Sequence, residues 1–157
     1  ARADRLLETM TSGMAGFLKA WNEVARPSHL EHFAWHGLLF KGHVMLCCSG
    51  LDALSPEEFD EHLRPRHEGI LRKFGGGAIQ AEGVVDHCIE SMAETEGVTA
   101  VLVTAPALND MERIHAATIQ QGIVLACHYD GEALEGLDLS AGYVPSDPAT
   151  FERRPWL

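Results

Sequence analysis

The chain has 157 residues, of which 46% are apolar and 22% are charged, so it can bury a core and is neither a disordered tail nor a collagen-like fibre. Its 12 Lys and Arg residues against 23 Asp and Glu residues give a net charge of −11, the wrong sign for binding phosphates. We therefore expect no nucleic-acid partner. No apolar run reaches the roughly 18 to 20 residues that cross a bilayer, and the first residues lack a signal peptide's apolar stretch. The sequence predicts a cytoplasmic protein without a membrane partner.

The first 37 residues form a separate predicted unit, an amino-terminal helix with a connecting loop, and residues 38–157 form the main unit. Apolar residues recur at steps of three and four from Ala3 to Arg26, which predicts a long amphipathic helix. We expect an interruption near Gly13 or Gly16 and an end at Pro27. The His-rich and aromatic segment that follows has no clean period, so it is predicted as a loop with a short helical turn.

Short apolar runs then alternate with amphipathic stretches. The predicted strands are His43–Cys48, Ala78–Ala81, Thr99–Thr104 and Ile123–His128, and the predicted helices are Pro56–Phe74, Val84–Glu94 and Asp110–Gln121. Ser55 before Pro56 is a strong helix-start signal, and the glycines near 75, 97 and 122 end the helices. The βαβαβαβ order predicts an α/β fold with a parallel sheet and right-handed crossovers. From Gly131 onward we expect extended structure laid over the sheet.

Parallel sheets carry their functional groups at the carboxyl ends of the strands. Gln80 and Glu82 flank Ala81, so strand alternation puts both side chains on one side. They form a substrate clamp or an acid/base pair, or Glu82 only caps the next helix. Ser49 and Asp52 follow the first strand, and they either bind substrate or only form a turn. A G-x-S-x-G elbow is missing from the sequence, which argues against a serine hydrolase.

Cysteine and histidine residues give no recognised metal motif. The four cysteines Cys47, Cys48, Cys88 and Cys127 lie in apolar segments without C-x-x-C spacing, so we expect buried, reduced thiols. Cys127 and His128 point to opposite faces of one strand, and His62, His67 and His115 are interpreted as surface histidines on helices. We therefore predict no metal ligands and one histidine, His128, that faces the site.

Four segments together resemble the uroporphyrinogen decarboxylase superfamily. Ser49 to Gly77 resembles its strand-end, loop and helix segment, with matches at Ser49, Leu54, Pro56, Phe59 and Pro65. Phe74 to Gly83 is similar to a glycine-rich strand of the corrinoid-linked methyltransferase branch, and Leu102 to His128 resembles the strand-helix-strand that follows it. Leu139 to Pro148 is similar to the carboxyl-terminal turn of that branch.

The family fold is a (β/α)8 TIM barrel of more than twice this length, so the resemblance implies that this chain is the carboxyl-terminal half of such a barrel. A half-barrel alone leaves two edge strands unpaired. The resemblance therefore implies a second chain, or a dimer partner, that completes the barrel around a small-molecule substrate.

The methyltransferase branch binds zinc with a His-x-Cys pair and a Cys in the carboxyl-terminal turn, whereas this chain has Gln80, Glu82 and Tyr143 at those positions. Zinc that activates a thiol needs soft ligands, so the zinc chemistry of the branch is in doubt. The resemblance fixes no cofactor and leaves a corrinoid or a tetrapyrrole as the candidates. The resemblance implies a methyltransferase in which Gln80 and Glu82 orient the substrate, Tyr143 donates a proton and His128 acts as acid or base.

Three alternatives stay open at this point. The first is a tetrapyrrole decarboxylase, although the family has a His where this chain has Tyr143. The second is a non-catalytic half-barrel that serves binding or assembly. The third is an unrelated flavodoxin-like open sheet, although Gly75 to Gly77 precede a strand and so do not form a phosphate-binding loop.

Overall fold

The computed structural model describes residues 2–25, 32–35, 38–128, 132–140 and 142–146. The elements are α1 (Arg2–Ala25), β1 (His32–Trp35), β2 (Leu38–Lys41), β3 (Val44–Cys48), η1 (Leu51–Ala53), α2 (Pro56–Glu58), η2 (Phe59–Leu63), α3 (Arg64–Phe74), β4 (Gly77–Ala81), η3 (Asp86–Cys88), α4 (Ile89–Ala93), β5 (Val98–Val103), η4 (Pro106–Leu108), α5 (Met111–Gln121), β6 (Val124–His128) and β7 (Tyr143–Ser146). Within this described part, no helix combines the length and apolarity that a membrane span requires.

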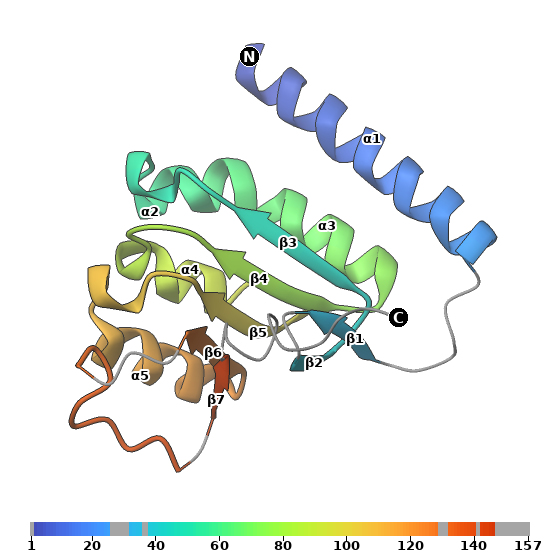
Figure 1. The fold of residues 1–157 in the computed structure, drawn as a ribbon. Coiled ribbons are helices and arrows are strands. Elements are labelled where there is room, and N and C mark those ends of the chain that lie inside the picture. Colours follow the sequence, from blue (N-terminus) through green and yellow to red (C-terminus); the bar gives the residue numbers. More distant parts are fainter. Residues whose placement is uncertain (1, 26–31, 36–37, 129–131, 141, 147–157) are drawn as a thin grey trace.

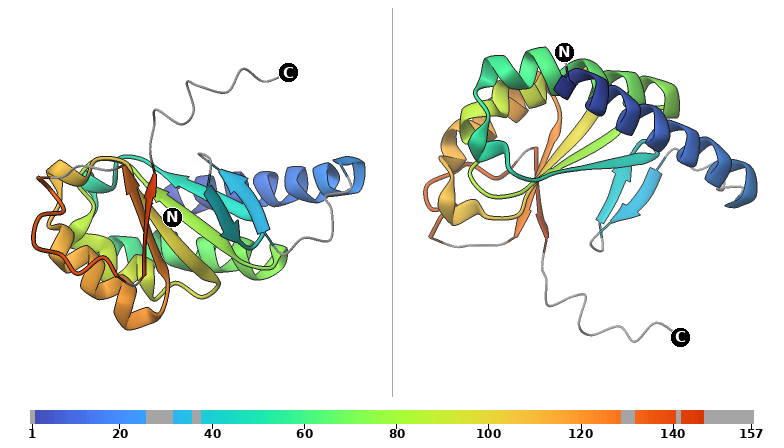
Figure 2. Two further views of the ribbon diagram at one scale, coloured as in Figure 1. Left: turned by 60° about the horizontal axis from the view of Figure 1, so that its bottom comes forward. Right: turned by 90° about the horizontal axis from the view of Figure 1, so that it is seen from above.

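The main sheet has five parallel strands in the order β3-β4-β5-β6-β7 (Figure 1). The order follows the sequence without a reversal, so right-handed crossovers place the connecting helices on one face of the sheet. Figure 2 shows α3, α4 and α5 in an arc on that side and the β1-β2 hairpin on the other. The predicted α/β fold with a parallel sheet is confirmed. The described strands show no reversal of strand order, whereas a complete flavodoxin-like sheet contains one.

The helix signals in the sequence work as expected. Ser55 Oγ accepts a hydrogen bond from the Glu58 backbone N–H at 3.2 Å, and Glu58 accepts one from the Ser55 N–H at 2.9 Å. This capping box, with Pro56 at the first helical position, starts the helical run that ends at Phe74. The middle of the run, η2, is a π-helical segment.

Two sequence predictions at the amino-terminal end are wrong. Helix α1 is continuous from Arg2 to Ala25, without an interruption at Gly13 or Gly16. A glycine in a helix costs only about 1 kcal/mol relative to alanine, and one side of α1 docks on the body, where Leu18 contacts the main core. The segment predicted as a loop contains β1 and β2, which pair as an antiparallel hairpin, so the boundary between residues 37 and 38 falls inside that hairpin.

The carboxyl-terminal prediction also needs correction. Residues 143–146 do not lie over the sheet but extend it as β7, parallel to β6 and in register from Leu125 with Tyr143 to His128 with Ser146. Pro145 is part of this strand, and an edge strand tolerates proline because one side of its backbone needs no sheet partner. Residues 147–157 lie outside the described part of the chain.

The two faces of the main sheet differ in what covers them. The helix face carries large aliphatic residues that form the main core with the helices, among them Ile79, Val101 and Leu125. The opposite face, here named the open face, carries Ala78, Ala100, Leu102 and Ala126, which pack with Phe40 of β2 in a smaller cluster. The hairpin therefore covers part of the open face with one aromatic side chain.

Close backbone packing where the hairpin leads into the sheet requires glycine at two positions. Gly42 has φ +106°, and a Cβ there would lie 2.4 Å from the Gly76 carbonyl. A Cβ on Gly77 would lie 1.9 Å from the Val44 carbonyl oxygen. Any side chain at these positions would push β3 away from β4, so the glycines fix the register that aligns the strand ends.

Candidate functional site

Gln80 and Glu82 form a polar pair at the carboxyl end of β4. The Gln80 side chain is 8% exposed, and its amide Nε2 donates a hydrogen bond to Glu82 Oε1 at 3.2 Å. The Glu82 side chain is exposed, and its backbone N–H donates to the Cys48 carbonyl at 3.0 Å. Hydrogen bonds therefore position both the backbone and the side chain of Glu82. The sequence prediction that the two side chains lie together is confirmed by this contact.

Cys47 lies beside this pair on the open face, since it is in register with Gln80. Its side chain is exposed. Partial burial first, and the negative charge of Glu82 second, raise the pKa of the Cys47 thiol. A raised pKa reduces the fraction of thiolate, so the structure shows no activation of Cys47 as a nucleophile.

Cys48 points to the helix face, where its Sγ lies 3.7 Å from His67 Nε2 on α3. Burial raises the pKa of Cys48 to about 12 and lowers the pKa of His67 to about 4. Both groups are therefore uncharged, and they do not form the thiolate-imidazolium pair that a cysteine nucleophile requires. The prediction that Cys48, Cys88 and Cys127 are buried free thiols is confirmed, whereas Cys47 is exposed. The prediction that His67 is a surface residue is wrong, because it packs edge-on against Phe59.

Ser49 and Asp52 follow β3 at the same edge of the sheet. Both side chains are exposed, and Ser49 is adjacent to Cys48, whose carbonyl binds the Glu82 backbone. Asp52 lies in the short turn η1. The structure therefore places a hydroxyl and a second carboxylate in the loop after β3, at the same edge of the sheet as Glu82.

His128 and Tyr143 are separated by the strand register. His128 ends β6, at the carboxyl edge that also carries Glu82, and pairs with Ser146. Tyr143 begins β7 and pairs with Leu125, so its backbone lies at the amino end of that strand and not at the carboxyl edge. The side chains of both residues lie outside the described part of the structure, and their proposed roles in proton transfer remain predictions.

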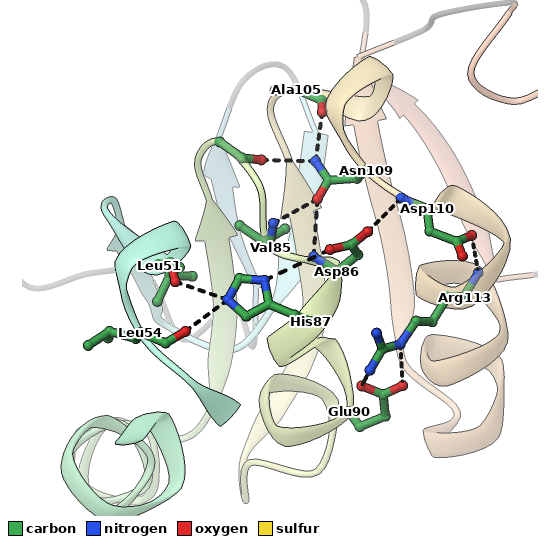
Figure 3. A network of polar contacts seen from close by, with 11 residues as sticks. Leu51, Leu54, Val85, Asp86, His87, Glu90, Ala105, Asn109, Asp110 and Arg113 are labelled. Carbon is green, nitrogen blue, oxygen red and sulfur yellow. Dashed lines mark hydrogen bonds and ion pairs between the residues drawn. The ribbon is translucent and has the colours of Figure 1, made fainter. Parts of the chain in front are cut away.

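A hydrogen-bond network links the loops at the carboxyl edge, and the sequence interpretation missed it (Figure 3). Asn109 Oδ1 accepts hydrogen bonds from the backbone N–H groups of Val85 and Asp86 at 2.7 and 3.1 Å. Its Nδ2 donates to the carbonyls of Gly83 and Ala105 at 2.9 and 2.8 Å. One side chain thus joins the loop after β4 to the loop after β5. Asparagine just before a helix signals a turn, and nothing local to it reveals these distant partners.

His87 extends this network to the loop after β3. Its Nε2 lies 3.1 Å from the Leu51 carbonyl and 3.0 Å from the Leu54 carbonyl, so the tautomer with a proton on Nε2 donates to both. Asp86 accepts a hydrogen bond from the Asp110 N–H at 2.9 Å. Hydrogen bonds therefore join the loops after β3, β4 and β5, and they stabilise the edge of the sheet that carries Gln80 and Glu82.

A cavity of about 590 Å³ lies elsewhere, between α5 and residues 133–138. Its lining includes four carboxylates and a histidine, namely Asp110, Glu112, Glu135, Asp138 and His115. Hydrogen bonds from Ser140 lower the pKa of Asp138, and an electrostatic interaction with His115 lowers it further. None of the predicted site residues lines this cavity.

In the described part of the chain, no group of three or more His, Cys, Asp or Glu side chains is arranged to hold a metal ion. Comparisons with protein-family models, curated proteins and solved structures found no match to this chain.

Proposed function

We propose that this chain is a uroporphyrinogen decarboxylase-like enzyme, most similar to a corrinoid-dependent methyltransferase with substituted zinc ligands, and that Gln80 and Glu82 bind its small-molecule substrate. The observation that carries the proposal is the Gln80–Glu82 hydrogen bond at the carboxyl edge of a parallel sheet. In barrels built from βα units, this edge is where substrates bind.

The strand order supports the half-barrel part of the proposal. In a (β/α)8 barrel the strands are parallel neighbours in sequence order, and all the helices lie on the outer face of the sheet. The sheet of this chain has the same strand order and carries its connecting helices on one face. In the described part of the chain, the sheet ends at β3 and β7. A second chain or a dimer partner that pairs with these two strands would complete the barrel and enclose the open face.

Glu82 supplies the chemistry of the proposed site. One carboxylate oxygen accepts the Gln80 amide hydrogen bond, which leaves lone pairs on both oxygens available to a ligand donor. The exposed carboxylate can orient an N–H group or take up a proton. The hydrogen bond from Gln80 restricts the carboxylate, so part of the entropic cost of ordering it is met before the substrate binds.

Charge favours a corrinoid over a tetrapyrrole polyacid. Glu82 and Asp52 are exposed acidic residues that follow β4 and β3 at this edge, and the whole chain carries a net charge of −11. A ligand rich in carboxylates would be repelled, whereas the neutral amides around a corrinoid can donate hydrogen bonds to carboxylates. When bound, a corrinoid supplies the methyl-transfer chemistry. Zinc does not fit the site, because Gln80 and Glu82 replace the soft ligands that such chemistry uses.

Hydroxocobalamin and uroporphyrin, titrated separately and followed by visible absorbance, test the proposal. We expect the protein to bind hydroxocobalamin and Glu82→Gln to weaken this binding about tenfold, because a charged hydrogen-bond acceptor is replaced by a neutral one. Glu61→Gln, at an exposed glutamate in η2, is the matched control and should bind as the unmodified protein does. Preference for uroporphyrin would favour the decarboxylase instead.

The second candidate is a non-catalytic half-barrel that serves assembly, favoured by the two edge strands of the described sheet. Such a module would bind neither pigment and would change only its particle size. Light scattering combined with intact-mass analysis of every chain in the particle distinguishes the two candidates. Failure of both pigments to bind would reject the enzymatic proposal.

A further inference from the structure

Helix α1 presents a continuous row of large apolar side chains to solvent. The row is named the outer stripe and consists of Leu6, Met10, Met14, Phe17, Trp21 and Val24, which are 61%, 62%, 48%, 65%, 56% and 80% exposed. Phe17 and Trp21 stack with ring centroids 6.4 Å apart. In Figures 1 and 2, α1 runs along the outside of the molecule beside α3.

The other side of α1 is attached to the body, so the outer stripe does not arise from a helix that has no docking face. Leu18 packs against the main core. The Asp4 carboxylate lies 3.2 Å from His62 and 3.7 Å from Arg66, and its backbone carbonyl accepts a hydrogen bond from Arg66. With this orientation fixed, the outer stripe faces away from the protein's own core.

The spacing of the outer stripe fits another helix. From Met10 to Val24 the steps alternate between four and three residues, which keeps the apolar side chains on one line as in a coiled-coil seam. Gly13 and Ala20 flank this line, and a Cβ added to Gly13 would meet nothing within 4 Å. A second helix can therefore approach closely along the whole row.

The charge of α1 indicates which partner helix can pack on the outer stripe. Helix α1 contains three basic residues, Arg2, Arg5 and Lys19, and three acidic ones, Asp4, Glu8 and Glu23, so it is neutral in a chain of net charge −11. A neutral surface attracts neither a basic protein nor an anionic lipid surface. Two copies of this acidic chain can therefore meet along α1 without concentrated like charge.

The exposed area is sufficient for a stable pair. The six side chains together expose about 800 Å² of surface per copy, which is what each partner contributes to an interface of standard size. A patch of this size also exceeds the several hundred Å² that monomeric proteins usually leave exposed. Aromatic and methionine residues, which are enriched at interface cores, dominate it.

We propose that the outer stripe of α1 is a self-association surface, on which the α1 helices of two copies of this chain pair about a two-fold axis. The pairing is isologous, since the same six side chains contribute from both copies. It does not depend on the chemistry of Glu82, and it uses a surface separate from the edge strands β3 and β7.

Sedimentation equilibrium over a wide concentration range tests this proposal. The unmodified chain should associate to a dimer, and Phe17→Glu should raise its dissociation constant at least about thirtyfold, because a central aromatic contact is replaced by a charge. Leu39→Glu is the matched control, since Leu39 is 72% exposed on β2. It introduces the same charge at an exposed leucine and should leave the dimer unchanged.

Trp21 reports on the same surface directly. In a chain with Trp35→Phe and Trp156→Phe, the emission of Trp21 should shift to the blue as the dimer forms, and Met10→Glu should abolish the shift while the far-ultraviolet circular dichroism stays the same. A chain that remains monomeric throughout, or a dimer that Phe17→Glu and Met10→Glu leave intact, would overturn the proposal. A monomer whose Trp21 is protected only while residues 147–157 are present would overturn it too, because the stripe would then be covered by its own chain.

Discussion

The two faces of the main sheet are built from the same strands but with different side chains. Toward the helices, β4, β5 and β6 carry Ile79, Val101 and Leu125, which are fully buried. Toward the hairpin, the neighbouring positions in these strands are Ala78, Ala100 and Ala126. The large side chains fill the space between sheet and helices, and the alanines leave space above the other face. Stability is therefore concentrated on one face, while the other has room for Phe40 and for the polar pair at its edge.

Substitution of one phenylalanine on each face tests whether the two faces contribute unequally to stability. Phe59, which is fully buried, packs in the helix-face core, and Phe40, which is 4% exposed, packs on the open face. We expect Phe59→Ala to lower the free energy of unfolding by about 4 kcal/mol, because it leaves a cavity in the largest core. Phe40→Ala should cost about 2 kcal/mol, because the hairpin can detach locally and relieve part of the loss.

Urea unfolding of the two variants measures these values, and amide hydrogen exchange separates their mechanisms. Phe40→Ala should accelerate exchange in β1 and β2 while the amides of β4 and β5 keep their protection. Equal destabilisation by the two substitutions, with exchange accelerated throughout the sheet, would show that the hairpin is part of one cooperative core and would remove the distinction between the faces.

The buried histidine of the helix face gives a pH-dependent effect of intermediate size. Burial lowers the pKa of His67 to about 4 from an ordinary value of 6.5, so between these values the unfolded chain binds a proton that the folded chain does not. The stabilising neutral form is fully effective above pH 6.5, and stability falls as the pH drops from 6.5 toward 4. The contribution of this residue is about 1 kcal/mol per pH unit within that window.

Replacement of His67 by leucine should flatten the pH dependence of the urea midpoint in this range. His67 suits this substitution because its Nδ1 is buried without a hydrogen-bond partner in the described structure, so the change removes no polar contact from that atom. An identical slope for His67→Leu would mean that His67 is accessible to protons in the folded state.

The sequence predicted the regular part of the fold because its strands are continuous apolar runs bounded by glycine. The four predicted strands match β3, β4, β5 and β6 to within a few residues. The hairpin escaped prediction because its residues lack an alternating pattern, and β7 escaped because it contains Pro145, which signals a turn unless the strand lies at an edge.

The site was only partly accessible to sequence reasoning. Gln80 and Glu82 could be paired because they share one strand and its period of two. Asn109 could not be placed, because its four hydrogen-bond partners come from two loops, one of which lies more than 20 residues away in the sequence. The position of Tyr143 depends on the register between β6 and β7, and register across a long connection leaves no local signal.

The smallest expected effect is a change in thiol reactivity at the edge of the open face. Of the four cysteines, only Cys47 has an exposed side chain, so Ellman's reagent should modify one thiol rapidly in the folded protein and none in Cys47→Ser. The charge of Glu82 contributes to the raised pKa of this thiol, so Glu82→Gln should increase the rate of modification severalfold at a fixed pH near 8. Glu61→Gln should not change the rate. If Glu82→Gln left the rate unchanged as well, the carboxylate would have to point away from Cys47, and the polar pair would no longer face the space that the alanines leave open.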